Sequence, residues 1–214
     1  MLADLRPVVI TTCVNYWDFL RVTLPITNSF ATKIYIVTTP EERVPDDIIA
    51  MATVIRTPAF NTSTFNKSAA LHETQMQVHA DHPNDWILLL DADIIARPEL
   101  CHDVGCKETL YSVYRLDYAT PEEFALDRGT PYHTPGAGYF QLYYDKTKVY
   151  PESSEDASEC DMVFYRSFPK QRILGGAVSH LGIHTVNWKG RTSPVWTSPV
   201  WTRTSLECAL RASL

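Results

Sequence analysis

The sequence predicts an α/β protein with a mostly parallel central sheet, helices on both faces and a small antiparallel extension. Short apolar, β-branched runs recur at residues 7–12, 33–38 and 86–90. Segments of helical character separate them, at residues 16–26, 45–51 and 66–79. Continuous apolar strands that alternate with helices are typical of parallel sheets covered on both faces. A weaker strand is expected at residues 53–56.

The second half of the chain has a different pattern. Residues 110–116 and 139–144 alternate aromatic and other side chains, as strands of a mixed or antiparallel sheet do. Gly and Pro are frequent between them and mark turns. The remaining expected elements are short helices at 122–127 and 161–168 and short strands at 173–174 and 178–181.

The sequence predicts one domain over residues 1–191. After Arg191 the pattern fails, and the pentapeptide TSPVW at residues 192–196 is repeated at once at 197–201. Five residues are too few for a repeat architecture. We therefore interpret residues 192–214 as an appendage, either a linker or a remnant of expression.

Composition excludes several classes of protein. The 214 residues carry a net charge of −6, which argues against a nucleic-acid binder and against binding to an anionic membrane surface. No run of 18 apolar residues exists, so we expect no membrane span. Five cysteines without a disulfide spacing and an N-terminus without a signal layout predict reduced thiols and a cytoplasmic protein.

The strongest motif is Asp91-Ala92-Asp93, directly after the apolar run that ends at Leu90. Strand alternation would place both carboxylates on the same side of the chain. Ligands of open α/β sheets bind at the carboxyl ends of the strands. Oxygen ligands at such a place suit Mg²⁺ or Mn²⁺ carrying a diphosphate. The bland alternative is a solvated strand end with two turn-forming aspartates.

The same motif has a second functional interpretation. A strand that ends in Asp-x-Asp also opens phosphatases of the haloacid dehalogenase type, in which Asp91 would be the nucleophile and Asp93 an acid and base. That motif usually continues with Gly or Thr and lies on the first strand. Here Ile94 follows, and the strand is at least the third. Both differences weaken the phosphatase hypothesis.

Two segments before this motif are candidate donor-binding elements. Asn66 and Lys67 open the expected third helix, where they can donate to an anionic or sugar ligand or serve only as a cap and a solvated lysine. Thr11, Thr12 and Tyr16 lie in the loop after the first strand, where a base could stack on the tyrosine ring.

Further candidates follow in the second half. A neutral His180 can complete a metal site begun by carboxylates, although a single histidine is more often structural. Lys189 and Arg191 can hold a diphosphate. An acidic cluster of Asp156, Glu159 and Asp161 begins the expected helix at 161–168, and its carboxylates can cap that helix or deprotonate a hydroxyl.

Taken in order, these segments resemble the glycosyltransferases of the GT-A fold, which use nucleotide-sugar donors. The resemblance spans about residues 7–191 and includes a Gly-rich segment at 136–140. Small soluble members of this kind are similar to bacterial enzymes and to those of large algal viruses, among them chlorella-virus capsid glycosyltransferases. For a viral protein, the expected cytoplasm is that of the host.

The resemblance implies roles for individual residues. Asp93 and His180 would bind Mn²⁺ or Mg²⁺, and Asp91 would contact the donor ribose or the water shell of the metal. Ala92 would belong to the same donor site, Gly138 would line the sugar, and Lys189 and Arg191 would hold the diphosphate. Asp161 is the nearest match to a catalytic base, but Cys160 departs from the usual acidic pair and leaves the base in doubt.

The sequence therefore predicts a metal-dependent glycosyltransferase. Its donor would be a nucleoside diphosphate sugar, most often a UDP-sugar in such proteins, and its acceptor a hydroxyl of a glycan or glycoprotein. Two alternatives stay open at this point: the phosphatase, and a module that binds nucleotide sugars without transferring them.

Overall fold

The computed structural model describes residues 5–60, 66–132, 134, 138–152 and 157–182 of the chain. Its strands are β1 (Val8–Thr12), β2 (Lys33–Thr38), β3 (Thr53–Arg56), β4 (Ile87–Leu90), β5 (Ile94–Ile95), β6 (Thr109–Tyr118), β7 (Thr130–Tyr132), β8 (Phe140–Tyr143) and β9 (Lys170–Leu181). Its α-helices are α1 (Trp17–Phe30), α2 (Asp46–Ile49), α3 (Lys67–Asp81), α4 (Pro121–Ala125) and α5 (Ala157–Arg166), and its 3₁₀ turns are η1 (Pro58–Phe60) and η2 (Pro98–Cys101).

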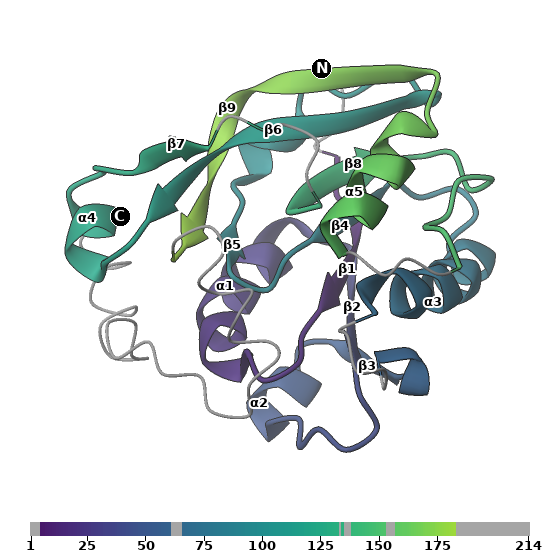
Figure 1. Ribbon diagram of the computed structural model, residues 1–214, viewed down its shortest axis with the longest axis horizontal. Helices are drawn as coiled ribbons and strands as arrows, with labels where there is room; N and C mark the ends of the chain where they lie inside the picture. Colours follow the sequence, from purple (N-terminus) through teal and green to yellow (C-terminus); the bar gives the residue numbers. More distant parts are fainter. Residues whose placement is uncertain (1–4, 61–65, 133, 135–137, 153–156, 183–214) are drawn as a thin grey trace.

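The first half of the chain builds the parallel part of one sheet. Strands β3, β2, β1 and β4 are neighbours in that order and all run parallel (Figure 1). Every residue of β1 and β4 is buried, because both faces of the sheet are covered. One face packs against α1 and α2, through Phe19 and Ile48, and the other against α3 and α5, through Leu71 and Phe164. The predicted α/β class is confirmed.

The second half adds strands of both directions. Strand β8 is antiparallel to β4 and β6, whereas the long β9 is parallel to β6 and antiparallel to β5. Strand β7 pairs with β6 beside this path. The sheet order β3-β2-β1-β4-β8-β6-β9-β5 thus places the parallel strands on one side and the mixed strands on the other (Figure 1).

Strand β9 differs from its prediction. Residues 173–174 and 178–181 were expected to be separate strands, yet they belong to one strand with a register shift against β6. Pairing passes from Ile173 directly to Ala177, so the intervening residues bulge. Gly176 has a φ of +99°, which glycine adopts without the penalty that other residues incur. Gly175 and Gly176 therefore allow the strand to bulge without ending it.

Two helices also extend beyond their predicted ends. Helix α1 continues past Pro25 to Phe30, and α5 begins at residue 157, four residues before the predicted start. A proline inside a helix removes a hydrogen bond and costs about 3 kcal/mol. Leu24 and Phe30 are nonetheless buried in the core, and we attribute the continuation of the helix to this burial.

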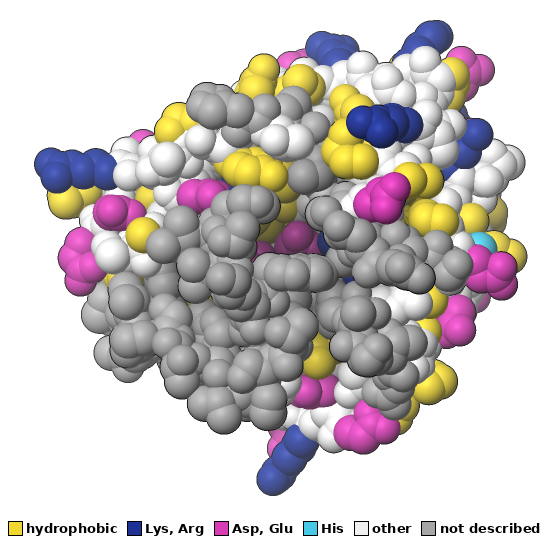
Figure 2. Space-filling model, viewed as in Figure 1, with side chains coloured by type: hydrophobic (Ala, Val, Ile, Leu, Met, Phe, Trp, Pro, Cys, Tyr) yellow, Lys and Arg dark blue, Asp and Glu magenta, His cyan; other side chains and the backbone are white. Residues whose placement is uncertain are grey.

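The helices and one face of the surface can be compared with the expectations from composition. None of the helices within the described ranges combines the length and the apolar character needed to cross a bilayer. On the face shown in Figure 2, the described Lys and Arg side chains stand scattered and do not form one basic patch.

Candidate active site

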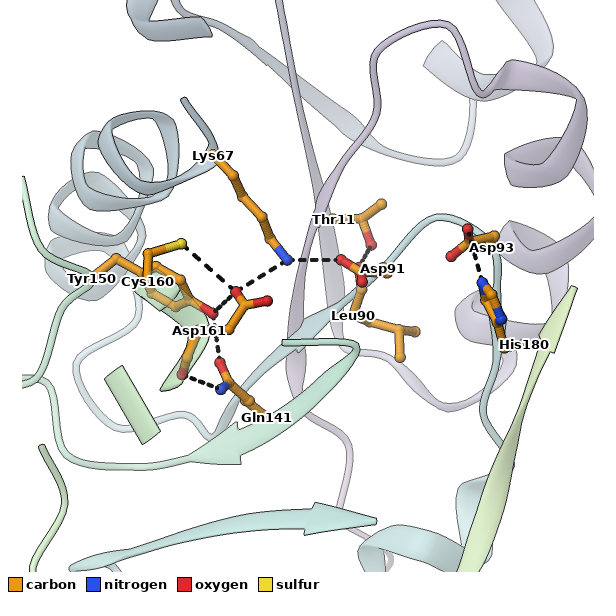
Figure 3. Close-up of polar contacts among 10 residues, drawn as sticks. All are labelled: Thr11, Lys67, Leu90, Asp91, Asp93, Gln141, Tyr150, Cys160, Asp161 and His180. Carbon is orange, nitrogen blue, oxygen red and sulfur yellow. Dashed lines mark hydrogen bonds and ion pairs between the residues drawn. The ribbon is translucent and has the colours of Figure 1, made fainter. Parts of the chain in front are cut away.

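The Asp91-Ala92-Asp93 segment lies at the carboxyl end of β4, where the strand has already ended. It forms a turn, closed by a hydrogen bond from Ile94 N to Asp91 O of 3.2 Å. Strand alternation therefore does not extend through the motif, and the predicted common side for both carboxylates is wrong. Asp91 points toward Lys67 and Asp93 toward His180 (Figure 3).

Two buried threonine hydroxyls hold this segment in place. Thr11 Oγ1 at the end of β1 donates to Leu90 O at 2.7 Å, and Thr23 Oγ1 of α1 donates to Ala92 O at 2.8 Å. Ala92 itself is 1% exposed. In this structure Thr11 and Ala92, both predicted to contact the donor, serve to fix the backbone that carries the two aspartates.

Lys67 joins two carboxylates. Asn66 caps α3 by accepting a hydrogen bond from Ala69 N at 3.1 Å, so Lys67 is the first helical residue. Its Nζ lies 3.0 Å from Asp91 Oδ1 and 3.3 Å from Asp161 Oδ1. The Lys67 ammonium thus stands between two carboxyl groups, with its side chain only 5% exposed. The charge of Lys67 is matched inside the protein and is not presented alone to a ligand.

Asp161 is buried on α5 and has an unusual acidity. Burial raises the pKa of its carboxyl group, Lys67 opposes this rise, and the nearby Asp91 adds to it, with a raised pKa as the net result. Its neighbour Cys160 is fully buried, and burial likewise raises the pKa of the thiol to about 12. Cys160 is therefore a neutral thiol, and Asp161 is the titratable member of the pair.

Gly138 makes room for this carboxyl group. A Cβ atom at residue 138 would lie 2.2 Å from the carboxyl carbon and from Oδ1 of Asp161. Such a distance is far below van der Waals contact, so only glycine fits while Asp161 keeps its position. The predicted place of Gly138 in the site is consistent with this contact. The preceding Gly136 and Ala137 lie outside the described residues.

A second polar cluster surrounds His180 near the end of β9. The ring Nδ1 lies 2.9 Å from Asp117 Oδ1, and Nε2 lies 3.4 Å from Asp93 Oδ2. Arg115 Nε in turn lies 2.8 Å from Asp117 Oδ1. Burial lowers the pKa of His180, but the Asp93 and Asp117 carboxylates outweigh this and raise it. Arg115, Asp117, His180 and Asp93 thus form a buried row in which basic and acidic side chains alternate.

Asp93 and His180 fit a divalent cation as part of a site. They offer one carboxylate and one imidazole that face one another, and Asp117 orients the imidazole as partners of metal-bound histidines do. Over the described ranges, no group of three such ligands lies together. Mg²⁺ is commonly held by one or two carboxylates together with substrate phosphates and water, so two protein ligands are compatible with such a cation.

The structure places Thr11 and Thr12 in β1 itself and not in the predicted loop after it, and it places Tyr16 directly before α1. Tyr16, which was expected to stack on a base, is 2% exposed and stacks on Phe19 with ring centroids 5.7 Å apart, so its ring is part of the core here. Thr12 is 4% exposed, and its hydroxyl has no hydrogen-bond partner among the residues the structure describes. A buried hydroxyl without a partner is costly, but Thr38 and Ser112 share this property, so it does not by itself single out Thr12.

The remaining residues that the sequence predicted for the site are either not described by the structure or lie on its surface. Lys189 and Arg191 are outside the described residues, as are Asp156 and the whole of 192–214. Glu159 is exposed on α5, whereas Asp161 of the predicted acidic cluster reaches Lys67.

Sequence reasoning did not include four polar residues that support the site. Arg115 and Asp117 lie two residues apart on β6 and are both buried. Charges are rarely buried without partners, so two opposite charges at strand spacing among aromatic residues were an available indication. Gln141 and Tyr150 hydrogen-bond Asp161, and only the polar Gln within an apolar strand hinted at this.

Comparison with known proteins adds only distant likenesses. No family model matches the chain, and no curated protein matches its sequence. A protein from Bacillus anthracis, described as a glucose-1-phosphate thymidylyltransferase and solved with sucrose, is 12% identical, with a TM-score of 0.46 over 87% of this chain and 94% of that chain.

Two further solved structures are similar at the same level. A nucleotide-diphospho-sugar transferase from Desulfovibrio desulfuricans is 14% identical, with a TM-score of 0.49 over 97% of this chain and 95% of that one. The apo form of the glycosyltransferase GlyE of Streptococcus pneumoniae is 14% identical, with a TM-score of 0.37 over 78% of this chain and 45% of that chain. Each TM-score is below 0.5, so the chain's own geometry carries the functional argument.

Proposed function

We propose that this protein is a metal-dependent glycosyltransferase. It moves a sugar from a nucleoside diphosphate sugar, preferentially a UDP-sugar, to a hydroxyl of a glycan or glycoprotein acceptor. The observation that carries the proposal is the pairing of Asp93 with His180 beside the Lys67–Asp91–Asp161 cluster. The aspartates of the motif follow β4 at its carboxyl end, the edge of an α/β sheet at which ligands bind.

Asp93 and His180 would hold Mn²⁺ or Mg²⁺. When bound there, the cation neutralises negative charge that develops on the leaving diphosphate. Asp117 keeps the His180 ring in one orientation, and the main-chain bond from Leu181 N to Asp93 O of 2.9 Å ties β9 to the motif. The two ligands are therefore positioned by the fold before any donor arrives.

The donor would lie along the ends of β1 and β4. The unpartnered Thr12 hydroxyl can bond the nucleoside, and Asp91 can accept from a ribose hydroxyl with the oxygen that does not face Lys67. In this proposal Lys189 and Arg191 bind the diphosphate, because a guanidinium grips phosphate bidentately and an ammonium adds a point charge.

Asp161 is the candidate base for the acceptor hydroxyl if transfer inverts configuration. A raised pKa suits this role, because a general base works best when its pKa approaches the working pH. Gly138 leaves the space that its carboxyl group occupies. The acceptor hydroxyl would give its proton to Asp161 while its oxygen attacks the anomeric carbon and the diphosphate departs.

The phosphatase alternative is less well supported by the geometry. It requires Asp91 as a nucleophile with Asp93 close by as its acid and base. The turn instead directs the two carboxylates to different partners, Lys67 and His180. A metal-dependent transferase would use the Asp93–His180 pair for the cation and the Lys67–Asp91–Asp161 cluster for the donor and acceptor.

Calorimetric titration of UDP tests the proposal. We expect binding with Mn²⁺ present and its loss after chelation, followed by glycoside formation across a panel of UDP-sugars and acceptors. Failure of UDP, dTDP and GDP to bind under either condition contradicts the proposal. Metal-dependent binding without product from any donor and acceptor would instead support a binding module.

A further inference from the structure

The hydrogen-bond network around Asp161 determines where its protons lie. Gln141 Nε2 lies 3.1 Å from the backbone oxygen of Asp161, and Gln141 Oε1 lies 2.7 Å from the hydroxyl of Tyr150. The reverse orientation of the amide would bring two carbonyl oxygens within 3.1 Å of each other. Since a carbonyl oxygen only accepts hydrogen bonds, the amide nitrogen must face Asp161 O. Gln141 therefore presents an acceptor to Tyr150.

The hydroxyl group of Tyr150 has one proton and lies close to two oxygen atoms. Its hydroxyl oxygen lies 2.7 Å from Gln141 Oε1 and 2.8 Å from Asp161 Oδ1 (Figure 3). The amide oxygen of Gln141 cannot supply a proton, so the phenol proton belongs to that contact. A hydrogen bond between Tyr150 and Asp161 then requires a proton on the carboxyl group of Asp161, which donates it to the phenol oxygen. An ionised Asp161 would leave one of these two short oxygen–oxygen contacts without a proton.

We propose that Tyr150 is a positioning residue whose hydroxyl oxygen accepts a hydrogen bond from the protonated carboxyl group of Asp161 and so holds this side chain as a neutral acid in the free protein. This arrangement gives every short contact a proton. It deepens the proposed function and rests on it for its meaning in catalysis, since a neutral Asp161 must lose its proton before it can act as a base.

The surrounding charges are compatible with a neutral acid. Lys67 faces Asp161 from α3, Asp91 from the turn after β4, and Cys160 from the same helix. With Asp161 neutral, the Lys67 ammonium pairs with the Asp91 carboxylate at 3.0 Å, and the charges of Lys67, Asp91 and Asp161 sum to zero. The burial of Asp161 and its raised pKa point in the same direction. An ionised Asp161 would add an uncompensated negative charge to a buried cluster.

The direction in which the pKa of Asp161 changes when Tyr150 is replaced tests this proposal, and the measurement requires no enzyme activity. Carbon NMR of protein labelled at the aspartate carboxyl groups follows the titration of Asp161, whose resonance is assigned by its loss in Asp161→Asn. We expect a protonated Asp161 at neutral pH. In Tyr150→Phe the acid loses its acceptor, so its pKa should fall by about one pH unit, the effect of one hydrogen bond. If Tyr150 instead donates to a carboxylate, the same change raises the pKa.

Gln141→Met is a second variant that tests the same hydrogen bond if Tyr150→Phe does not fold. Tyr150→Phe keeps the ring that stacks on Phe164 with centroids 4.6 Å apart, so we expect it to fold, which circular dichroism checks. Gln141→Met removes the acceptor and frees the phenol proton for Asp161, which should also lower the pKa. An ionised Asp161 at neutral pH in the wild type, or an unchanged or raised pKa in the variants, overturns the proposal. These results are independent of whether the protein transfers sugars.

Discussion

Nδ1 of His180 lies 2.9 Å from Oδ1 of Asp117, and this contact determines which ring nitrogen is offered to Asp93. An imidazole whose Nδ1–H donates a hydrogen bond to a carboxylate keeps Nε2 for a metal, and such a partner also increases the basicity of the ring. Asp117 is itself held by Arg115. The residue that orients the proposed metal ligand therefore comes from β6, far from either ligand in the sequence.

Replacing Asp117 should weaken metal binding without removing a ligand. In Asp117→Asn the His180 ring loses its charged partner, so Mn²⁺ affinity should fall by about ten-fold or more. Isothermal titration or electron paramagnetic resonance of Mn²⁺ measures this directly. Asp103→Asn, a change at an exposed aspartate, is the matched control and should bind Mn²⁺ as the wild type does. Equal affinities in both variants would show that Asp117 has no such role.

Removing the proposed carboxylate ligand should abolish most transfer activity. Asp93→Ala leaves His180 alone, and we expect turnover to fall by about 100-fold or more, since charge stabilisation by a metal contributes several kcal/mol. Asp103→Ala should retain activity. Near-normal turnover in a folded Asp93→Ala protein would refute the assignment of this residue.

Gly138 should not tolerate a side chain. In Gly138→Ala the new methyl group would overlap the Asp161 carboxyl group, so the carboxyl must move. We expect a loss of about 1–3 kcal/mol in the free energy of unfolding, as overpacking usually causes. Urea unfolding measures it, with Gly105→Ala as the control, because a Cβ there meets no atom within 4 Å. A similar stability of both variants would contradict the close packing.

Lys67 should contribute strongly to stability. Lys67→Met leaves Asp91 and Asp161 near one another without the cation between them. Removing one partner of a buried ion pair costs about 3–5 kcal/mol, and we expect a loss of that order in urea unfolding at neutral pH. Lys170→Met removes an exposed pair with Glu108, 3.7 Å away, and should have little effect. Comparable losses in the two variants would contradict the buried role of Lys67.

Neutralising Asp161 should stabilise the protein in a pH-dependent manner. Its pKa is raised in the folded state, so its contribution to stability is present below the unfolded value, about 3.9, and is lost as the pH rises through the folded value. Asp161→Asn removes this dependence. The stability of the variant relative to the wild type should therefore increase with pH above about 4. A difference that is constant from pH 4 to 8 would show that the folded pKa is not raised.

Local pattern was sufficient for the parallel half of the fold and for the position of the motif. Apolar runs bounded by helices predicted β1, β2 and β4, because burial on both faces removes polar residues from such strands. The carboxyl end of β4 located Asp91 and Asp93, and Asn66 is the helix cap that its residue type allowed. These features depend on neighbours in the chain, so the chain alone reveals them.

The tertiary structure decided which side chains meet. The turn after Leu90 separates Asp91 from Asp93, and the packing of α3 and α5 brings Lys67 to Asp161, 94 residues away in number but 3.3 Å away in space. The burial of Tyr16 in the core likewise depends on what packs around it. Periodicity reports which side of an element is buried, whereas partners distant in the chain depend on how the elements pack, and no local pattern records that.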